Sequence, residues 1–226
     1  MARVTFRMAT MGALLFLVAC NTQDRNPAPA RSVEGYYCLL DKVLSERKQK
    51  IELYLQRLQF QAGAAQADTL MQACFRSLNQ ASRNRQTRGT QGGQANKELQ
   101  NVEMALLVHH VKSYPIFYDI LFIDTAGNIF HTVLQEPDNN KSLLGDDLAR
   151  TSLSQKIRMK PQKAFVDFQD YAVSDEPAAF FVEPVRNSDG LAGWFAFQVS
   201  INKLNYLLSD NEQLGATGEE IGRAHV

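Results

Sequence analysis

The sequence predicts an α+β fold with long helices first and an antiparallel β-sheet after them. Residues 34–80 contain no proline and repeat apolar residues at helical spacing, whereas β-branched and aromatic runs separated by turn-forming segments follow Pro115. Helices followed by strands are typical of α+β domains. The 226 residues, 45% of them hydrophobic, suffice for one good core or two small ones. Basic and acidic residues number 24 each, so we expect no nucleic-acid partner.

The first twenty residues predict an export signal. Arg3 and Arg7 precede an apolar run over residues 11–19, and basic residues before an apolar run are the order of a secretory signal peptide. The run is about half as long as the ~20 residues that a membrane-spanning helix needs. We therefore expect residues 1–20 to target the chain and then to be removed.

The end of this segment, Leu17-Val18-Ala19-Cys20, resembles the lipobox of bacterial lipoproteins, in which the cysteine is lipidated and becomes the mature N-terminus. The alternative is an ordinary signal peptide with a chance cysteine. Residues 21–33 are polar and proline-rich, as expected of a flexible tether. The resemblance implies a lipoprotein on the periplasmic side, anchored to the membrane at Cys20.

The other two cysteines, Cys38 and Cys74, would lie in an oxidising compartment after export. They could form a disulfide, or they could be two buried thiols, because the sequence gives no distance between them.

Residues 34–114 predict a long helical segment. Residues 62–68 lack large side chains and predict a helix break, residues 83–96 predict an exposed loop, and a second helix is expected over residues 97–112. The first helix carries a stripe that fits either a seam on the chain's own sheet or a helix pair in a homodimer. This stripe consists of Tyr37, Leu40, Leu44, Ile51, Tyr54 and Leu58.

Residues 115–210 predict the sheet. Residues 117–123 and 128–135 flank the turn-forming residues 124–127, so they predict an antiparallel hairpin. Further elements are expected as strands at 164–168, 178–185 and 191–199, a short helix at 147–159 and a closing helix at 201–208.

Three stretches, YDILFIDTAGNIFHTVLQEPDNNKSLL, FVDFQDYAVSDEPAAFFVEPV and DGLAGWFAFQVSINKLNYLL, followed by LGATGE, resemble the membrane-distal module of double Cache sensors. These are PAS-like extracytoplasmic domains of chemotaxis receptors, sensor kinases and cyclases. The resemblance covers residues 34–219 and implies a Cache module at 115–210, with residues 211–219 beginning a link to a second module. It also implies a small-molecule ligand on the sheet face, under the connecting loops.

The resemblance directs attention to an aromatic and charged run between Arg158 and Phe181. The Arg-x-Trp-Tyr signature of amino-acid-sensing members is absent, although Arg158 could pair with a ligand carboxylate. Alternatively, the phenylalanines are core residues and the charges are exposed. The candidate ligand-binding residues are Tyr118, His131, Arg158, Asp167, Phe168, Asp170, Tyr171 and Phe180.

The sequence predicts no enzyme, no metal site and no cofactor. His109 and His110 are adjacent on a helix and point about 100° apart, so they cannot share a metal ion as an i, i+4 pair could. The sequence has no glycine-rich phosphate loop, Gly-x-Ser-x-Gly elbow or His-Glu-x-x-His motif.

Residues 220–226, EIGRAHV, depart from the family pattern, which continues into the first strand of a second module. Back-translated as GAG ATC GGA AGA GCA CAC GTC, they match a common sequencing adapter after the first base. We therefore expect an adapter-derived tail on a fragment truncated before its output domain. The leading functional hypothesis is a sensor module. The alternatives are a free-standing Cache lipoprotein that binds a ligand without signalling, and a scaffolding lipoprotein.

Overall fold

The computed structural model describes residues 33–88, 93–171, 173–174 and 176–209. The chain divides into two units, Met1–Cys38 and Leu39–Val226. Of the first unit only residues 33–38 are described, as the start of a helix. The expected signal peptide, Cys20, the tether, the link and the tail lie outside the described residues, apart from Val33, and they stay predictions.

Three helices precede the sheet: α1 (Val33–Ala67), α2 (Thr69–Arg88) and α3 (Gly93–Ser113). The predicted break within residues 62–68 is confirmed at Asp68. The predicted loop over residues 83–96 is wrong for most of its length, because α2 and α3 extend into it from both sides. This stretch lacks large apolar residues, which removes the periodic signal, but its arginine and glutamine residues favour an exposed helix.

Asp68 joins the three helices. Its Oδ1 accepts hydrogen bonds from the backbone nitrogens of Leu70 (2.8 Å) and Met71 (3.2 Å), and so it caps the start of α2. Its Oδ2 accepts a hydrogen bond from the Tyr114 hydroxyl (2.9 Å) and lies 2.9 Å from Nε2 of His109. Burial would raise the pKa of the Asp68 carboxyl, but these hydrogen bonds hold it below its ordinary value.

The sheet follows the predicted order. Its strands are β1 (Asp119–Asp124), β2 (Ile129–Thr132), β3 (Ala164–Gln169), β4 (Ala178–Asn187) and β5 (Gly190–Ser200). They pair antiparallel in the spatial order β2-β1-β5-β4-β3. The predicted hairpin, the three later strands and the closing helix, α5 (Ile201–Leu208), are confirmed. The short helix expected at 147–159 consists of a 3₁₀ turn, η1 (Asp146–Arg150), and α4 (Ser152–Arg158).

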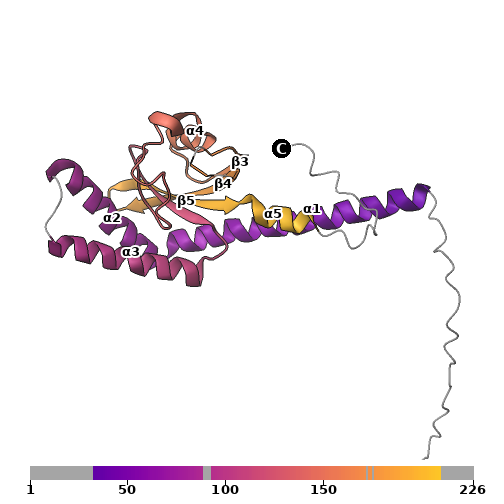
Figure 1. The fold of residues 1–226 in the computed structure, drawn as a ribbon, viewed down its shortest axis with the longest axis horizontal. Helices are drawn as coiled ribbons and strands as arrows, with labels where there is room; N and C mark the ends of the chain where they lie inside the picture. The colour runs from indigo at the N-terminus through magenta and orange to yellow at the C-terminus, as the bar shows by residue number, and fades with distance from the viewer. Residues whose placement is uncertain (1–32, 89–92, 172, 175, 210–226) are drawn as a thin grey trace, which may run out of the picture. The chain divides into compact units, whose positions relative to one another are not determined.

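Both faces of the sheet are covered (Figure 1). On the helix face, the side chains of α1, α2 and α3 pack on Phe122, Phe195 and Phe197. On the loop face, η1, α4 and the segment before them pack on Leu121, Phe180 and Trp194. The strands therefore carry apolar residues in near-continuous runs, as expected of a sheet that is buried on both sides.

Gly193 lets the central strand approach its neighbours. A Cβ atom at this position would lie 2.1 Å from the Ile123 carbonyl oxygen and 2.8 Å from the Phe75 ring, and the residue has a φ of +151°. Only glycine fits a place where the backbone of β1 and an aromatic side chain of α2 come this close.

The cysteines do not form the disulfide that the sequence left open. Cys38 is exposed, Cys74 is buried, and both are free. Cys74 packs in the apolar core on the helix face, so burial rather than a bridge accounts for it. Among the described helices, none is both long and apolar enough to cross a membrane.

Replacing Asp68 with alanine removes the cap of α2 and leaves the Tyr114 hydroxyl and His109 without their acceptor. We expect Asp68→Ala to lower the free energy of unfolding by about 2–4 kcal/mol, the sum of one cap and one charged hydrogen bond. Urea unfolding measures the change. The control is Asp41→Ala, at an exposed position on α1, which should change stability by no more than about 0.5 kcal/mol. Equal losses in the two variants would contradict the role of Asp68.

Candidate functional site

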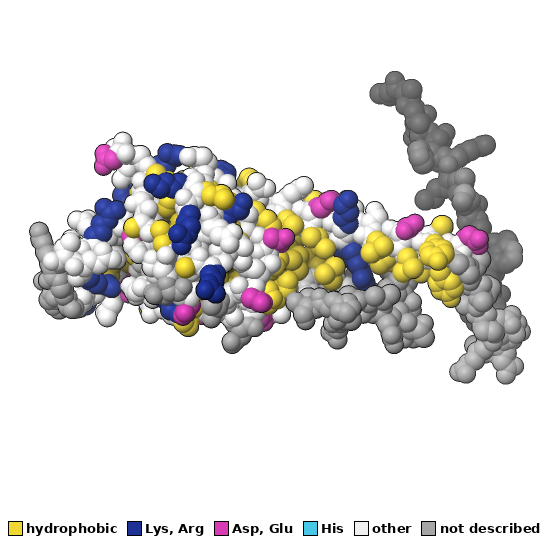
Figure 2. Space-filling model, turned by 90° about the horizontal axis from the view of Figure 1, so that it is seen from above, with side chains coloured by type: hydrophobic (Ala, Val, Ile, Leu, Met, Phe, Trp, Pro, Cys, Tyr) yellow, Lys and Arg dark blue, Asp and Glu magenta, His cyan; other side chains and the backbone are white. Residues whose placement is uncertain are grey.

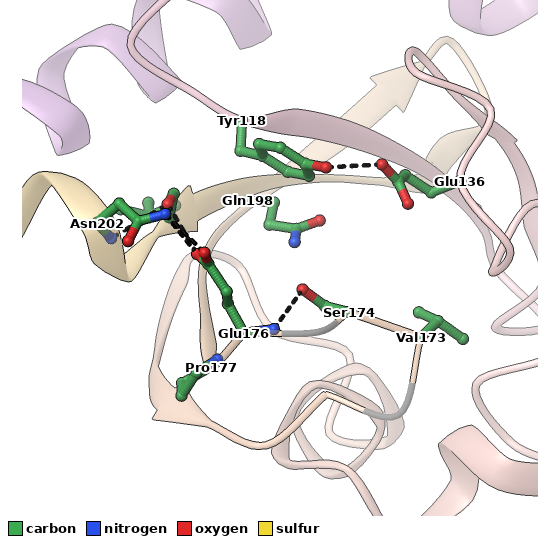
Figure 3. Close-up of a pocket in the computed structure, with 10 residues that line it drawn as sticks. Tyr118, Glu136, Val173, Ser174, Glu176, Pro177, Gln198 and Asn202 are labelled. Atoms are coloured by element: carbon green, nitrogen blue, oxygen red, sulfur yellow. Dashed lines mark hydrogen bonds between the residues drawn. The ribbon is translucent and has the colours of Figure 1, made fainter. Parts of the chain in front are cut away.

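A pocket of about 310 Å³ lies where β5 ends and α5 begins. Its volume is at the lower end of the range for small-molecule sites. Figure 3 shows that its walls come from segments far apart in the sequence, with the Gln198 amide pointing into the space between them. The lining residues are Tyr118, Glu136, Val173, Ser174, Glu176, Pro177, Gln198, Val199, Ser200 and Asn202.

The alternation of β5 explains why Gln198 reaches this pocket. Phe197 and Val199 pack on the helix face, so Gln198, between them, projects on the loop face. The backbone nitrogen of Tyr118 donates a 2.8 Å hydrogen bond to the Gln198 carbonyl oxygen, which fixes Tyr118 at the rim. The end of the sheet therefore brings an aromatic hydroxyl and an amide to one opening.

Two hydrogen-bonded pairs frame the opening (Figure 3). The Tyr118 hydroxyl donates to Glu136 Oε1 at 2.8 Å. On the other side, Nδ2 of Asn202 lies 2.6 and 2.8 Å from the two carboxylate oxygens of Glu176. The second pair connects the segment before β4 to the first turn of α5. The Glu136 carboxylate raises the pKa of Tyr118 to about 12, since the phenol proton is held in the hydrogen bond.

Two buried carboxyl groups lie behind this lining. Asp119 is fully buried, and its Oδ1 accepts hydrogen bonds from the backbone nitrogens of Ile120 (2.6 Å) and Leu134 (3.1 Å). Asp138 is 1% exposed, and its Oδ2 accepts a 2.8 Å hydrogen bond from the Tyr171 hydroxyl. The remaining oxygens, Asp119 Oδ2 and Asp138 Oδ1, are buried and have no hydrogen-bond partner.

These two groups hold protons more tightly than ordinary carboxyls. Burial raises the pKa of Asp119 to about 7, and the negative charges of Asp138 and Glu136 add to the effect beyond what two backbone hydrogen bonds offset. Burial also raises the pKa of Asp138, although the hydrogen bond from Tyr171 works against it. The pocket therefore lies against two acids with raised pKa values, and the charge of one of them, Asp119, changes near pH 7.

The structure brings two of the sequence-predicted site residues to this end of the loop face. Tyr118 lines the pocket, and Tyr171 binds Asp138 behind it. Phe180 is a core residue whose ring meets that of Tyr171 edge to face at 5.0 Å. Three predicted residues, Arg158, Asp167 and Asp170, are exposed and outside the pocket lining. The Arg158 guanidinium donates to the Leu144 carbonyl oxygen at 3.2 Å.

The other two predicted residues lie on the helix face. Phe168 is partly buried against the core there. His131 is 4% exposed, and its ring meets that of Phe122 edge to face at 5.5 Å. Burial lowers the pKa of His131 to about 4, so this ring is neutral at physiological pH. Neither residue lines this pocket, so their positions do not support the prediction that they contact a ligand there.

Sequence reasoning missed Glu136, Gln198, Asn202 and the buried pair Asp119 and Asp138. One signal was present: Asp119 stands directly before the apolar run Ile120–Ile123, where a carboxyl needs a structural or functional reason. Glu136 and Asn202 had no such signal, because acidic and amide residues are ordinary in loops and first helical turns.

A second hollow, of about 360 Å³, lies between α1 and the edge strand β3, where Phe165 and Phe181 contribute to its lining. It gathers fewer polar groups. No set of three or more His, Cys, Asp or Glu residues within the described ranges is arranged to hold a metal ion.

The chain is similar to solved structures, one of which shares its fold. The sensor domain of the histidine kinase DctB from V. cholerae superposes with a TM-score of 0.53 and 15% sequence identity, over 76% of this chain and 60% of that one. An extracellular ligand-binding receptor from Desulfohalobium retbaense gives a TM-score of 0.42 and 14% identity, over 76% and 27% of the two chains. No protein-family model matches the chain, and no curated protein sequence does.

The chain thus spans 60% of the length of the DctB domain. The α+β prediction is confirmed, and the fold is shared with that domain, in agreement with the resemblance to Cache modules noted from the sequence.

The raised pKa of Asp119 predicts how stability depends on pH. The unfolded carboxyl loses its proton near pH ~3.9, whereas the folded one keeps it up to about pH 7. The free energy of unfolding therefore falls as pH rises from about 4 to about 7, by on the order of 2–4 kcal/mol from this group. Asp119→Asn keeps both backbone hydrogen bonds and should lose that part of the pH dependence.

Chemical denaturation of the full chain at a series of pH values measures this difference. The matched control is Asp167→Asn, which removes an exposed carboxyl on β3 and should leave the pH profile unchanged. If Asp119→Asn and wild type keep the same slope between about pH 4 and 7, the Asp119 carboxyl is not a raised-pKa group.

Proposed function

We propose that this chain is the extracytoplasmic small-molecule-sensing domain of a membrane-anchored bacterial signal-transduction protein of the chemotaxis-receptor, sensor-kinase or cyclase type. The observation that carries the proposal is that one pocket is lined both by the end of the sheet, through Gln198, and by the first turn of α5, through Asn202. A ligand there contacts a rigid element and a peripheral one together. The Cache-like fold supports the same function.

The peripheral element, α5, has few contacts with the rest of the domain, as expected of a helix that transmits a signal. None of the eight residues of α5 is buried, and few buried contacts favour local motion. Its start is fixed by Ser200, whose side chain caps the helix by accepting a hydrogen bond from the Asn202 nitrogen at 3.2 Å, and by the Glu176–Asn202 pair. A ligand that competes for Glu176 or Asn202 therefore changes how α5 is held.

Such a change carries a signal only if the ligand binds one arrangement of α5 better than the other. In this proposal the loop before β4 and α5 are the two parts whose equilibrium the ligand shifts. The output belongs to a part of the protein beyond residue 219, the lipid on Cys20 anchors the chain, and no catalytic activity is assigned. A free-standing Cache lipoprotein would bind the ligand without this coupling.

A thermal-shift screen of small molecules on the full chain tests the proposal. A ligand at about a hundred times its dissociation constant should stabilise the wild type by ~2.7 kcal/mol. Gln198→Ala removes an amide from the pocket floor and should abolish the shift. Gln49→Ala, at an exposed position on α1 outside both hollows, is the matched control and should keep it. Ligands that shift the Gln198→Ala variant fully would place the site elsewhere.

Hydrogen exchange of α5 with and without the same ligand separates the two functions. A sensor should show altered exchange over Ile201–Leu208 when the ligand is bound, because the ligand changes the contacts of Asn202. Binding that leaves α5 exchange unchanged would support the free-standing lipoprotein instead.

The membrane anchor has its own test. Cys20 follows a basic and then apolar segment that ends in Leu17-Val18-Ala19, so metabolic labelling with a palmitate analogue should mark the wild type. Cys20→Ala should lose the label, whereas Cys38→Ala, which removes an exposed free thiol, should keep it. Labelling of the Cys20→Ala variant at the wild-type level would exclude Cys20 as the lipidation site.

A further inference from the structure

The pocket is lined by acidic groups and by no basic ones. Glu136 and Glu176 contribute carboxylates to the lining, and none of the described residues that line it is a lysine, arginine or histidine. Asp119 and Asp138 lie immediately behind: Asp119 follows Tyr118 and pairs with Gln198 across the strands, and Asp138 binds Tyr171. Two carboxyl groups thus line the pocket, and two more belong to residues that adjoin its lining.

Lys203, which follows the lining residue Asn202, has its Nζ 4.8 Å from the ring centroid of Tyr206 and does not line the pocket. Seen from the α4 side, lysine and arginine side chains are scattered over the outer surface of the domain (Figure 2). Arg158 is bonded to a backbone carbonyl there. Lys141, whose charge reaches Asp138, lies 3.9 Å from Asp147 at the surface. The charge of the pocket is therefore not balanced by a cation in its own wall.

In each of the two buried acids, one carboxyl oxygen has no hydrogen-bond donor. Asp119 Oδ2 and Asp138 Oδ1 are buried and have no partner, and a buried acceptor without a donor is unfavourable. Both residues are at least 99% buried. They adjoin pocket-lining positions in two separate segments, since Asp119 follows Tyr118, and Asp138 lies two residues after Glu136. The two carboxyl groups therefore lie next to the pocket wall and not in it.

We propose that the pocket selects a small organic cation with a primary ammonium group, held against Glu136 and Glu176 with Asp119 and Asp138 behind them. This inference rests on the proposed function and names its ligand class. An ammonium group supplies three donors and a positive charge. The carboxylates that already bind Tyr118 and Asn202 keep further acceptor sites, because an ionised carboxylate has about four.

The same arrangement disfavours an anionic ligand. A carboxylate in this pocket would meet the like-charged carboxylates of Glu136 and Glu176, and none of the described lining residues offers a guanidinium or ammonium group to pair with it. Neutral polyols would use Gln198, Ser174 and Asn202 but would gain nothing from the carboxylates' charge. Among ligands of the same size, we therefore expect cations to bind most tightly, neutral molecules less tightly and anions least.

Two matched four-carbon series test this order on the full chain by calorimetry at about pH 7.5, where amines are protonated and carboxylates ionised. One series has a functional group at both ends of the chain and consists of putrescine, 1,4-butanediol and succinate. The other has one functional group and consists of butylamine, butanol and butyrate. In each series we expect the amine to bind at least about tenfold more tightly than the alcohol, and the carboxylate to bind more weakly than either.

Single-charge variants locate the effect. Glu136→Gln keeps the acceptor for Tyr118 and should weaken putrescine binding about tenfold. The affinity of this variant for 1,4-butanediol should stay within about twofold of the wild-type value. The matched control is Asp189→Asn, which removes one charge at the β4–β5 turn, at the opposite end of β5. It should leave putrescine affinity unchanged.

The outcomes separate this inference from the proposed function. If amines bind no better than alcohols, or if none of the six compounds binds, the cation assignment is wrong, and the thermal-shift screen still decides whether the pocket binds another ligand. If succinate or butyrate binds most tightly and Gln198→Ala abolishes that binding, the pocket is the sensor site and the inference about charge is wrong. Equal weakening by Glu136→Gln and Asp189→Asn would also overturn it.

Discussion

The burial of β5 on both of its faces is the constraint on which the rest of the structure depends. Its neighbours β1 and β4 complete the backbone hydrogen bonding, and α1–α3 and the α4 segment exclude water from the two faces. Such a strand must be apolar along most of its length. On the loop face, the apolar residues of β5 end at Ala196, and Gln198 follows them. This change marks where the loop face passes from core to pocket.

The same constraint explains why the fold could be predicted from the sequence. Apolar runs bounded by turn residues predicted the positions of β3, β4 and β5. The apolar stripe in the proline-free residues 34–80 predicted α1. The prediction failed over residues 83–96, where α2 and α3 extend on polar residues. A helical stretch that buries few apolar residues leaves no apolar period to detect.

The site was less accessible to sequence reasoning because its residues come from four separate segments. The aromatic run from Arg158 to Phe181 drew attention by its composition. The pleat sends Phe180 into the loop-face core, however, and leaves Asp167 exposed. Only the tertiary pairing of β1 with β5 brings Tyr118 next to Gln198, and only the turn after β2 brings Glu136 to the Tyr118 hydroxyl. The residue types suggested that a pocket exists, but the strand pairing determines which residues line it.

The buried acids connect ligand chemistry to protons. The pKa of Asp119 is raised to about 7 by burial and by the charges of Asp138 and Glu136. A cation placed beside these groups, as proposed, offsets the negative charges of Asp138 and Glu136 but not the burial. It therefore favours the ionised form of Asp119. Binding near neutral pH would then release a proton from this pair, and by linkage the affinity for the cation rises with pH over the same interval. A neutral ligand, which leaves the charges of Asp138 and Glu136 unopposed, shows no such coupling through charge.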